Sequence, residues 1–137
     1  MNIDKFNTEW CLLQNQFDSY EKHSLYIKLI GILVFISTEI LDVVNVSVIF
    51  LLLVIWFQDG IWKTFQSRIE SRLLHIEKCI SIEKSEGAFQ FNTQYADIRL
   101  TGLALINEYV RQAIRPTVAF PHLALILVFI TQYFFYR

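Results

Sequence analysis

Two apolar stretches separated by one residue decide the fold: Leu25–Leu41, with the sequence LYIKLIGILVFISTEIL, and Val43–Phe57, with the sequence VVNVSVIFLLLVIWF. A third apolar stretch is Leu123–Phe135, LALILVFITQYFF. With its flanks each reaches about 18–20 residues, a helix of roughly 27–30 Å that can cross the hydrocarbon core of a bilayer. The flanks carry Tyr, Trp, Lys and Arg, which are enriched at membrane interfaces. We therefore predict three transmembrane helices, the first two forming a tight hairpin.

The composition supports a membrane protein. Of 137 residues, 54% are hydrophobic and 18% are charged, whereas soluble domains average about 45–50% and 25%. A soluble domain of this size has too little polar surface to cover three helices that are apolar all round. With 12 basic and 13 acidic residues, the chain lacks the excess positive charge of a nucleic-acid-binding protein, and we expect no nucleic acid partner. The alternative architecture is a two-span hairpin with an interfacial third segment.

Positive charges are distributed unevenly between the apolar stretches. Residues 1–28 hold three, the hairpin tip at 39–45 holds none, residues 58–116 hold eight, and the far end holds Arg137 alone. Positively charged loops stay on the cytoplasmic side of a membrane. We therefore expect a multi-pass protein of the inner (plasma) membrane, with the N-terminus and residues 59–116 cytoplasmic and the C-terminus on the opposite side.

The predicted fold class is an all-α membrane protein with a cytoplasmic helical bundle. Its expected parts are a cytoplasmic amphipathic helix (1–23), the two-span hairpin (24–58), a cytoplasmic helical region (59–116) and the third span (117–137). The second span is expected to continue as a helix to Lys84, despite the weak helix breaker Asp59-Gly60, and to stop near Gly87. Residues 88–94 are expected to form a loop, and residues 96–115 another helix before Pro116.

Two segments of the expected cytoplasmic part repeat apolar residues at intervals of three and four, a pattern typical of coiled-coil seams. The seam residues are Ile3, Phe6, Trp10, Leu13 and Phe17 in the first segment, and Phe65, Ile69 and Ile76 in the second. The seams can pair within one chain or between copies. Because one copy has few places to bury so many large side chains, we expect a homo-oligomer or a larger membrane complex in the bilayer.

Polar residues inside and beside the first span form a second candidate feature. Lys28 and Glu39 are three helical turns apart and lie on one face, and intramembrane ionisable groups are functional candidates. A pore-lining polar stripe would consist of Lys28, Ser37, Thr38, Glu39 and Asn45. Anchoring of Lys28 and Glu39 to lipid headgroups is the alternative, because both lie near the ends of the span.

A third candidate is the pair Arg68 and His75, whose R-x6-H spacing is similar to the R-x4-6-H pattern of HEPN-type ribonucleases. The alternative is an ordinary solvated charged face. The histidines and cysteines show no metal-ligand spacing, and no nucleotide-binding or hydrolase motif occurs. We therefore expect no metal, no cofactor and no enzymatic activity.

The expected elements follow the order of an amphipathic helix, a tight two-span hairpin and a long helix. The long helix opens with Phe57-Gln58-Asp59-Gly60-Ile61-Trp62-Lys63-Thr64-Phe65-Gln66-Ser67-Arg68. This arrangement resembles the SLATT-type small membrane effectors of bacterial conflict systems and their three-span relatives. The resemblance covers roughly residues 18–84. It implies an oligomeric, non-enzymatic effector that permeabilises the inner membrane when a partner senses infection. The chain departs from that pattern in its third span and in having no sensor domain.

From the sequence we therefore expect a small non-enzymatic membrane protein that acts through self-association of its helices, as a pore-forming or membrane-perturbing effector. One alternative is a small accessory or immunity subunit of a larger membrane complex. The other is a membrane-tethered HEPN-like ribonuclease.

Overall fold

The computed structural model describes residues 2–43, 45–83 and 86–135. The side chains of Asn2 and Ile3 lie outside the described part, and with them the predicted seam position Ile3. All regular structure in the described residues is helical, as the sequence predicts. The order is α1 (Asn2–Ile40), α2 (Val46–Ser81), α3 (Phe91–Ile98), α4 (Gly102–Ala113) and α5 (Pro116–Phe135).

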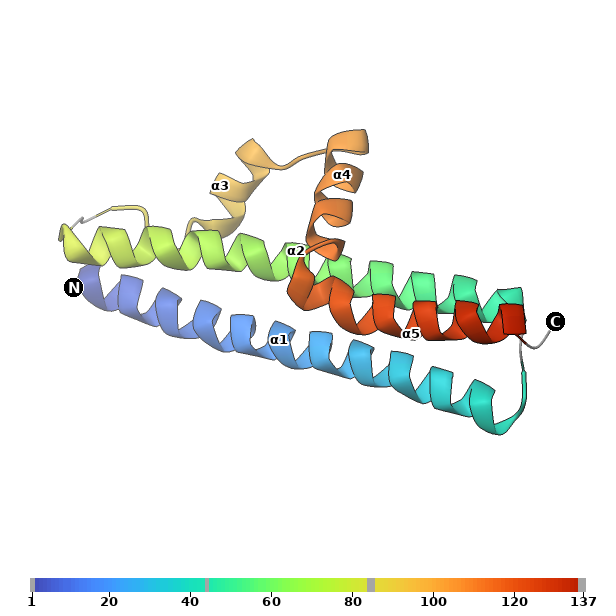
Figure 1. The fold of residues 1–137 in the computed structure, drawn as a ribbon. Coiled ribbons are helices and arrows are strands. Elements are labelled where there is room, and N and C mark those ends of the chain that lie inside the picture. The colour runs from blue at the N-terminus through green and yellow to red at the C-terminus, as the bar shows by residue number, and fades with distance from the viewer. Residues whose placement is uncertain (1, 44, 84–85, 136–137) are drawn as a thin grey trace.

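The two longest helices, α1 and α2, form an antiparallel hairpin that runs the whole length of the molecule (Figure 1). The predicted amphipathic segment and the first predicted span are one uninterrupted helix, α1. The chain then reverses between Ile40 and Val46, where Asp42 adopts the left-handed conformation with φ 51°. Asn45 caps the next helix, its side chain accepting a hydrogen bond from the backbone N–H of Ser47 at 3.2 Å.

Helix α2 continues through Asp59-Gly60, as we expected, but it ends at Ser81, before Lys84. The following residues account for this earlier end, because Glu83 is in the left-handed region with φ 50°. Gly87, expected at the end of the helix, has φ 103° and lies in the connection to α3.

The single helix expected over residues 96–115 is replaced by two helices. Helix α3 begins at Phe91, inside the segment predicted as a loop, and α4 begins only at Gly102. Arg99 is extended and Gly102 has φ 58°, so the helix cannot continue through this point. Pro116 is the first residue of α5, a position at which proline's missing N–H costs little.

Helix α5 packs beside the hairpin at the end where the chain reverses (Figure 1). We call residues 25–40, 46–62 and 116–135 the apolar half of the molecule and the remaining described residues the polar half. Helices α1, α2 and α5 are each long and apolar enough to cross a membrane, and their most apolar windows are only 11%, 22% and 22% buried inside the chain. Most of the apolar side chains there therefore face outward, as helices surrounded by lipid require. The small core between them consists of Val48, Leu52, Ile126 and Phe129.

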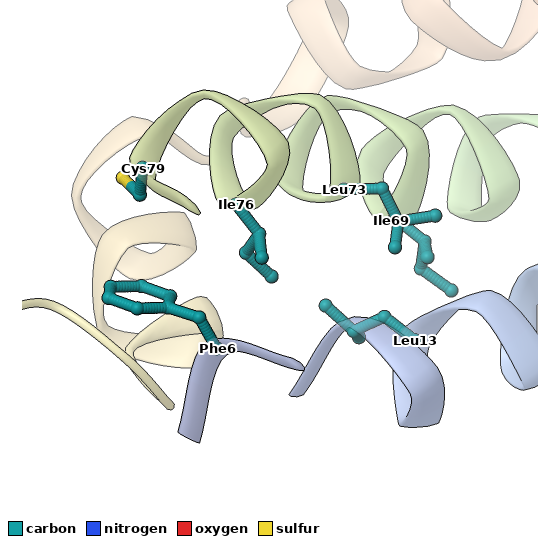
Figure 2. Close-up of a cluster of buried hydrophobic side chains, with 6 residues drawn as sticks. All are labelled: Phe6, Leu13, Ile69, Leu73, Ile76 and Cys79. Carbon is teal, nitrogen blue, oxygen red and sulfur yellow. The ribbon is translucent and has the colours of Figure 1, made fainter. Parts of the chain in front are cut away.

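The polar half has a separate core, in which the two predicted seams pair with each other within one chain. Figure 2 shows this cluster between α1 and α2, and its buried members are Phe6, Leu13, Ile69, Leu73, Ile76 and Cys79. Trp10 and Phe17 pack against it and are partly buried, whereas Phe65 remains 38% exposed. Because one copy buries most of these side chains, the seams by themselves do not require a second copy.

A buried ion pair fastens the remaining segments of the polar half to the hairpin. Arg72 on α2 donates to both carboxylate oxygens of Glu9 on α1, at 2.9 and 3.1 Å, and both side chains are almost fully buried. Arg72 also donates to the side chain of Gln94 at 2.6 Å and to the Gly87 carbonyl at 2.8 Å. Glu9 accepts the backbone N–H of Phe89 at 2.6 Å. The pair therefore holds α3 and the connection before it against both long helices.

Candidate functional site

The feature that stands out chemically is a carboxylate inside the apolar half. Asp59 lies on α2 and is 0% exposed. It is about 20 Å along the helix from Val46, in a helix that is long and apolar enough to cross a membrane. A charged side chain removed from water is costly unless other polar groups surround it.

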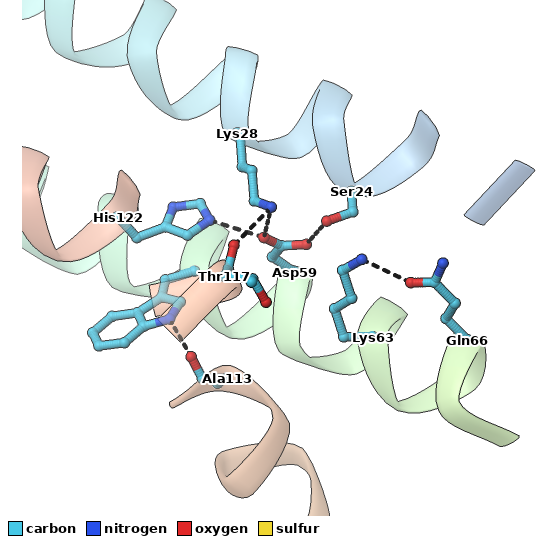
Figure 3. A network of polar contacts seen from close by, with 9 residues as sticks. Ser24, Lys28, Asp59, Lys63, Gln66, Ala113, Thr117 and His122 are labelled. Atoms are coloured by element: carbon cyan, nitrogen blue, oxygen red, sulfur yellow. Dashed lines mark hydrogen bonds and ion pairs between the residues drawn. The ribbon is translucent and has the colours of Figure 1, made fainter. Parts of the chain in front are cut away.

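Side chains from both neighbouring helices surround this carboxylate (Figure 3). The Ser24 hydroxyl on α1 donates a hydrogen bond to one carboxylate oxygen. His122 on α5 places Nε2 3.2 Å from the other oxygen, and the Lys28 ammonium on α1 lies 3.8 Å from that same oxygen. We call Ser24, Lys28, Asp59 and His122 the polar centre. It joins α1, α2 and α5 through groups that are buried, except for Lys28, whose side chain is 20% exposed.

Lys28 has a second partner that follows from the sequence of α5. Pro121 lies inside this helix and has no backbone N–H, so the Thr117 carbonyl four residues earlier has no partner in the helix ladder. The Lys28 ammonium donates to that carbonyl at 3.1 Å. Backbone groups released by proline inside a membrane helix need such a substitute partner. Lys28 therefore serves both the Asp59 carboxylate and the backbone of α5.

The C-terminal end of α4 is attached next to the polar centre. Trp56 donates its indole N–H to the Ala113 carbonyl at 2.9 Å, which provides a partner for a carbonyl at the helix end. One turn further along α2, Gly60 lets α4 approach closely, since a Cβ added there would lie 2.7 Å from the Cβ of Ala113. The Trp56 ring also stacks near His122, with centroids 6.4 Å apart and planes 15° apart. Asp59 and Gly60 thus fix α5 and α4, respectively, at one level of α2.

The arrangement can do two things. It opposes separation of the three long helices, because moving α1 or α5 away from α2 would leave the Asp59 carboxylate without its partners. It also brings a carboxylate, an amine and an imidazole together, so a proton can be held or exchanged among them. The described residues contain no group of three His, Cys, Asp or Glu placed to hold a metal ion.

Of the five residues of the predicted polar stripe, the structure places only Lys28 in this centre. Ser37 and Thr38 donate to backbone carbonyls of their own helix, at 2.8 and 2.7 Å. Glu39 accepts from Gln132 of α5 at 2.9 Å, and Asn45 caps α2. These four therefore lie near the hairpin turn, away from Lys28.

The structure brings Arg68 and His75 to one pocket of about 410 Å³ between α2, α3 and α4. Arg68 is already engaged there, because its guanidinium pairs with Glu108 at 3.3 Å and lies 4.9 Å from the centre of the Tyr95 ring. His75 is exposed and lies 3.5 Å from the Cys79 sulfur through Nε2.

Sequence reasoning missed Ser24, Asp59 and His122 as site residues. The available signal was the acidic residue within the helix that continues the second span, which we treated only as a weak helix breaker. His122 directly follows Pro121 at the start of an apolar stretch, and an isolated histidine carries little information until its partner is known.

Searches of protein-family models, of curated proteins and of solved structures found no match to this chain. In the part of the chain that the structure describes, all regular structure is helical and three helices are candidate membrane spans.

Proposed function

We propose that this protein is a small non-enzymatic effector of the inner membrane that perturbs the bilayer through association of its helices, and that the polar centre holds its closed conformation. The observation that carries the proposal is the fully buried Asp59, which is contacted from α1 and α5 within the apolar half. Ionisable residues within a membrane-spanning helix are expensive, so they are functional candidates by default.

The closed state follows from the contacts that the polar centre makes within one chain. Within one chain the Asp59 carboxylate has no exposed surface, so it lines no path for water or ions. A conducting state needs α5 or α1 to move. This movement exposes Asp59, Lys28 and His122 to water or to the same residues of neighbouring copies of the protein. Association of several copies can supply the polar surroundings that these groups then need.

The sequence supports the same proposal in two ways. The charge distribution favours a cytoplasmic polar half, with the hairpin turn and the C-terminus on the other side. The resemblance to SLATT-type effectors over residues 18–84 implies an oligomeric protein that permeabilises the membrane. Asp59 and Gly60 lie within the segment that carries this resemblance.

The test is membrane depolarisation on controlled expression in bacteria, followed with a potential-sensitive dye at matched protein levels in the membrane fraction. We expect wild-type protein to depolarise cells at high expression. Asp59→Asn, which keeps the shape but removes the charge, should lower the expression level needed for depolarisation. Asp18→Asn is the matched control, because Asp18 is exposed in the polar half. A normal potential with every variant contradicts the effector function, and protection by Asp59→Asn contradicts the closed-state role.

Oligomeric state in mild detergent separates this proposal from the accessory-subunit alternative. The effector should form a homo-oligomer, whose mass can be measured by light scattering with correction for bound detergent. A monomer that co-purifies with another membrane protein at fixed stoichiometry supports the accessory or immunity subunit instead.

One observation favours the ribonuclease as a second candidate, namely that Arg68 and His75 line the same pocket. Its test is cleavage of single-stranded RNA by the purified protein. The ribonuclease requires His75→Ala to abolish cleavage, and it is excluded if that variant cleaves as fast as wild type.

A further inference from the structure

Helix α4 differs in direction from the three long helices α1, α2 and α5. Figure 1 shows it running steeply across the common axis of α1, α2 and α5. Only Ile114 and Arg115 separate its end from the first residue of α5. If α1, α2 and α5 cross a bilayer, α4 lies along the membrane plane, at the level where α5 enters.

One face of this helix is both apolar and exposed. Three exposed apolar positions of α4 and the residue that caps its C-terminal end follow one another at intervals of three, four and four residues, which places them on one face. They are Leu103, Ile106, Val110 and Ile114, with exposed fractions of 84%, 51%, 41% and 63%. A continuous face of this kind, left open to water, would be a site of aggregation or association.

The opposite side of α4 fixes which way this apolar face points. Glu108 is separated by about 160° from Ile106 and Val110 around the helix, and it pairs with Arg68 at 3.3 Å. Arg68 lies on α2 about 13 Å beyond Asp59, on the side away from the apolar half. The face opposite Glu108 is therefore turned toward the apolar half. Tyr109 supports this placement, because its ring meets the Phe57 ring edge-on with centroids 6.3 Å apart.

We propose that α4 is an interfacial helix whose apolar face, Leu103, Ile106, Val110 and Ile114, is immersed in lipid at the membrane surface. Lipid is the occupant because this face ends two residues before α5, a helix that is apolar enough to cross a membrane and whose apolar window is only 22% buried. Arg99 and Arg111 are exposed near the two ends of α4, where their side chains can reach anionic headgroups. Amphipathic helices that lie in an interface combine an apolar face with such basic residues.

The experiment places single cysteines on the two sides of α4 in the full chain, in a Cys11→Ser, Cys79→Ser background. Ile106→Cys and Val110→Cys sample the apolar face, and Ala104→Cys samples an exposed position on the other side. Each variant is labelled with an environment-sensitive fluorophore and reconstituted into phosphatidylcholine–phosphatidylglycerol vesicles. Fluorescence is then quenched either by nitroxide-bearing lipid or by aqueous iodide.

We expect lipid quenching at Ile106 and Val110 to exceed that at Ala104 severalfold, with the order reversed for iodide. Iodide access at all three positions would overturn the proposal, because the face would then lie in water. Protection of Ile106 and Val110 from both quenchers would also overturn it, because protein would then cover the face. The result is independent of depolarisation, so failure of the proposed effector function and failure of this inference are distinguishable.

Discussion

Replacing Asp59 by leucine tests whether the three long helices depend on the polar centre. In the Asp59→Leu variant, the Ser24 hydroxyl and the His122 ring both lose their acceptor, and both residues are nearly fully buried, at 1% and 2% exposure. Each buried donor without a partner costs about 1–3 kcal/mol. Lys28 contributes less, because its side chain is 20% exposed and it retains the Thr117 carbonyl. We therefore expect a loss of about 3–5 kcal/mol in the free energy of helix separation.

A second variant separates this polar effect from simple packing. In the triple variant Ser24→Ala, Asp59→Leu, His122→Leu, apolar side chains replace the carboxylate and both of its hydrogen-bonding partners. Neither buried donor is therefore left without an acceptor. Replacing an entire buried polar group by apolar side chains is often close to neutral. The triple variant should therefore recover to within about 2 kcal/mol of wild type, while Asp59→Asn, which keeps one acceptor, should lose about 1–2 kcal/mol.

The assay is reversible unfolding by SDS of protein in mild-detergent micelles. Trp56 reports on the centre, because its ring stacks near His122, and tryptophan fluorescence can therefore follow the transition. Asp18→Asn is the control and should change stability by no more than about 0.5 kcal/mol. The reasoning is refuted if Asp59→Leu is as stable as wild type, or if the triple variant is no more stable than Asp59→Leu alone.

Three further predictions concern the surroundings of the centre and the polar half. Gly60→Ala should destabilise the protein by about 1–3 kcal/mol, because the new Cβ meets Ala113 at 2.7 Å, and Ala113→Gly in the same chain should restore part of the loss in the SDS assay. Arg72→Met should cost about 3–5 kcal/mol in thermal or SDS unfolding, because it strands the buried Glu9 carboxylate, and adding Glu9→Gln should recover most of it. Cys79, which is 3% exposed, should react with maleimide only after unfolding when the other cysteine is replaced by serine, and immediate labelling would contradict the packing of the polar half.

The long helices could be predicted from the sequence because their signals are local and repeated many times. Three apolar stretches of sufficient length and two seams of regular spacing each rest on many residues, so no single substitution would change them. The same reasoning placed the helix through Asp59-Gly60 correctly. Helix ends were less predictable, since Ser81 ends α2 and Gly102 separates α3 from α4 through conformations that depend on one or two residues.

The polar centre could not be predicted in the same way, because its members are far apart in sequence. Asp59 is 35 residues from Ser24 and 63 from His122, and no spacing rule joins residues of different helices. Lys28 was identified as a candidate from its position in the first span, but its expected neighbours were residues of its own helix and Asn45. Its actual partners are Asp59 on α2 and the carbonyl released by Pro121 on α5, and that relation requires the tertiary packing.

Asp59 and Gly60 connect the polar centre with helix α4. A carboxylate and a glycine in consecutive positions of a membrane-length helix weaken the helix locally, so their presence needs a tertiary reason. The carboxylate provides the contact with α1 and α5, and the glycine provides the close approach of α4. Because α4 leads into α5 through only two residues, a displacement of α4 at the membrane surface must move the start of α5, where Thr117 and His122 meet the centre. Conditions that change how α4 lies on lipid should therefore also change the stability of the polar centre, and the Asp59→Leu variant should lose that dependence.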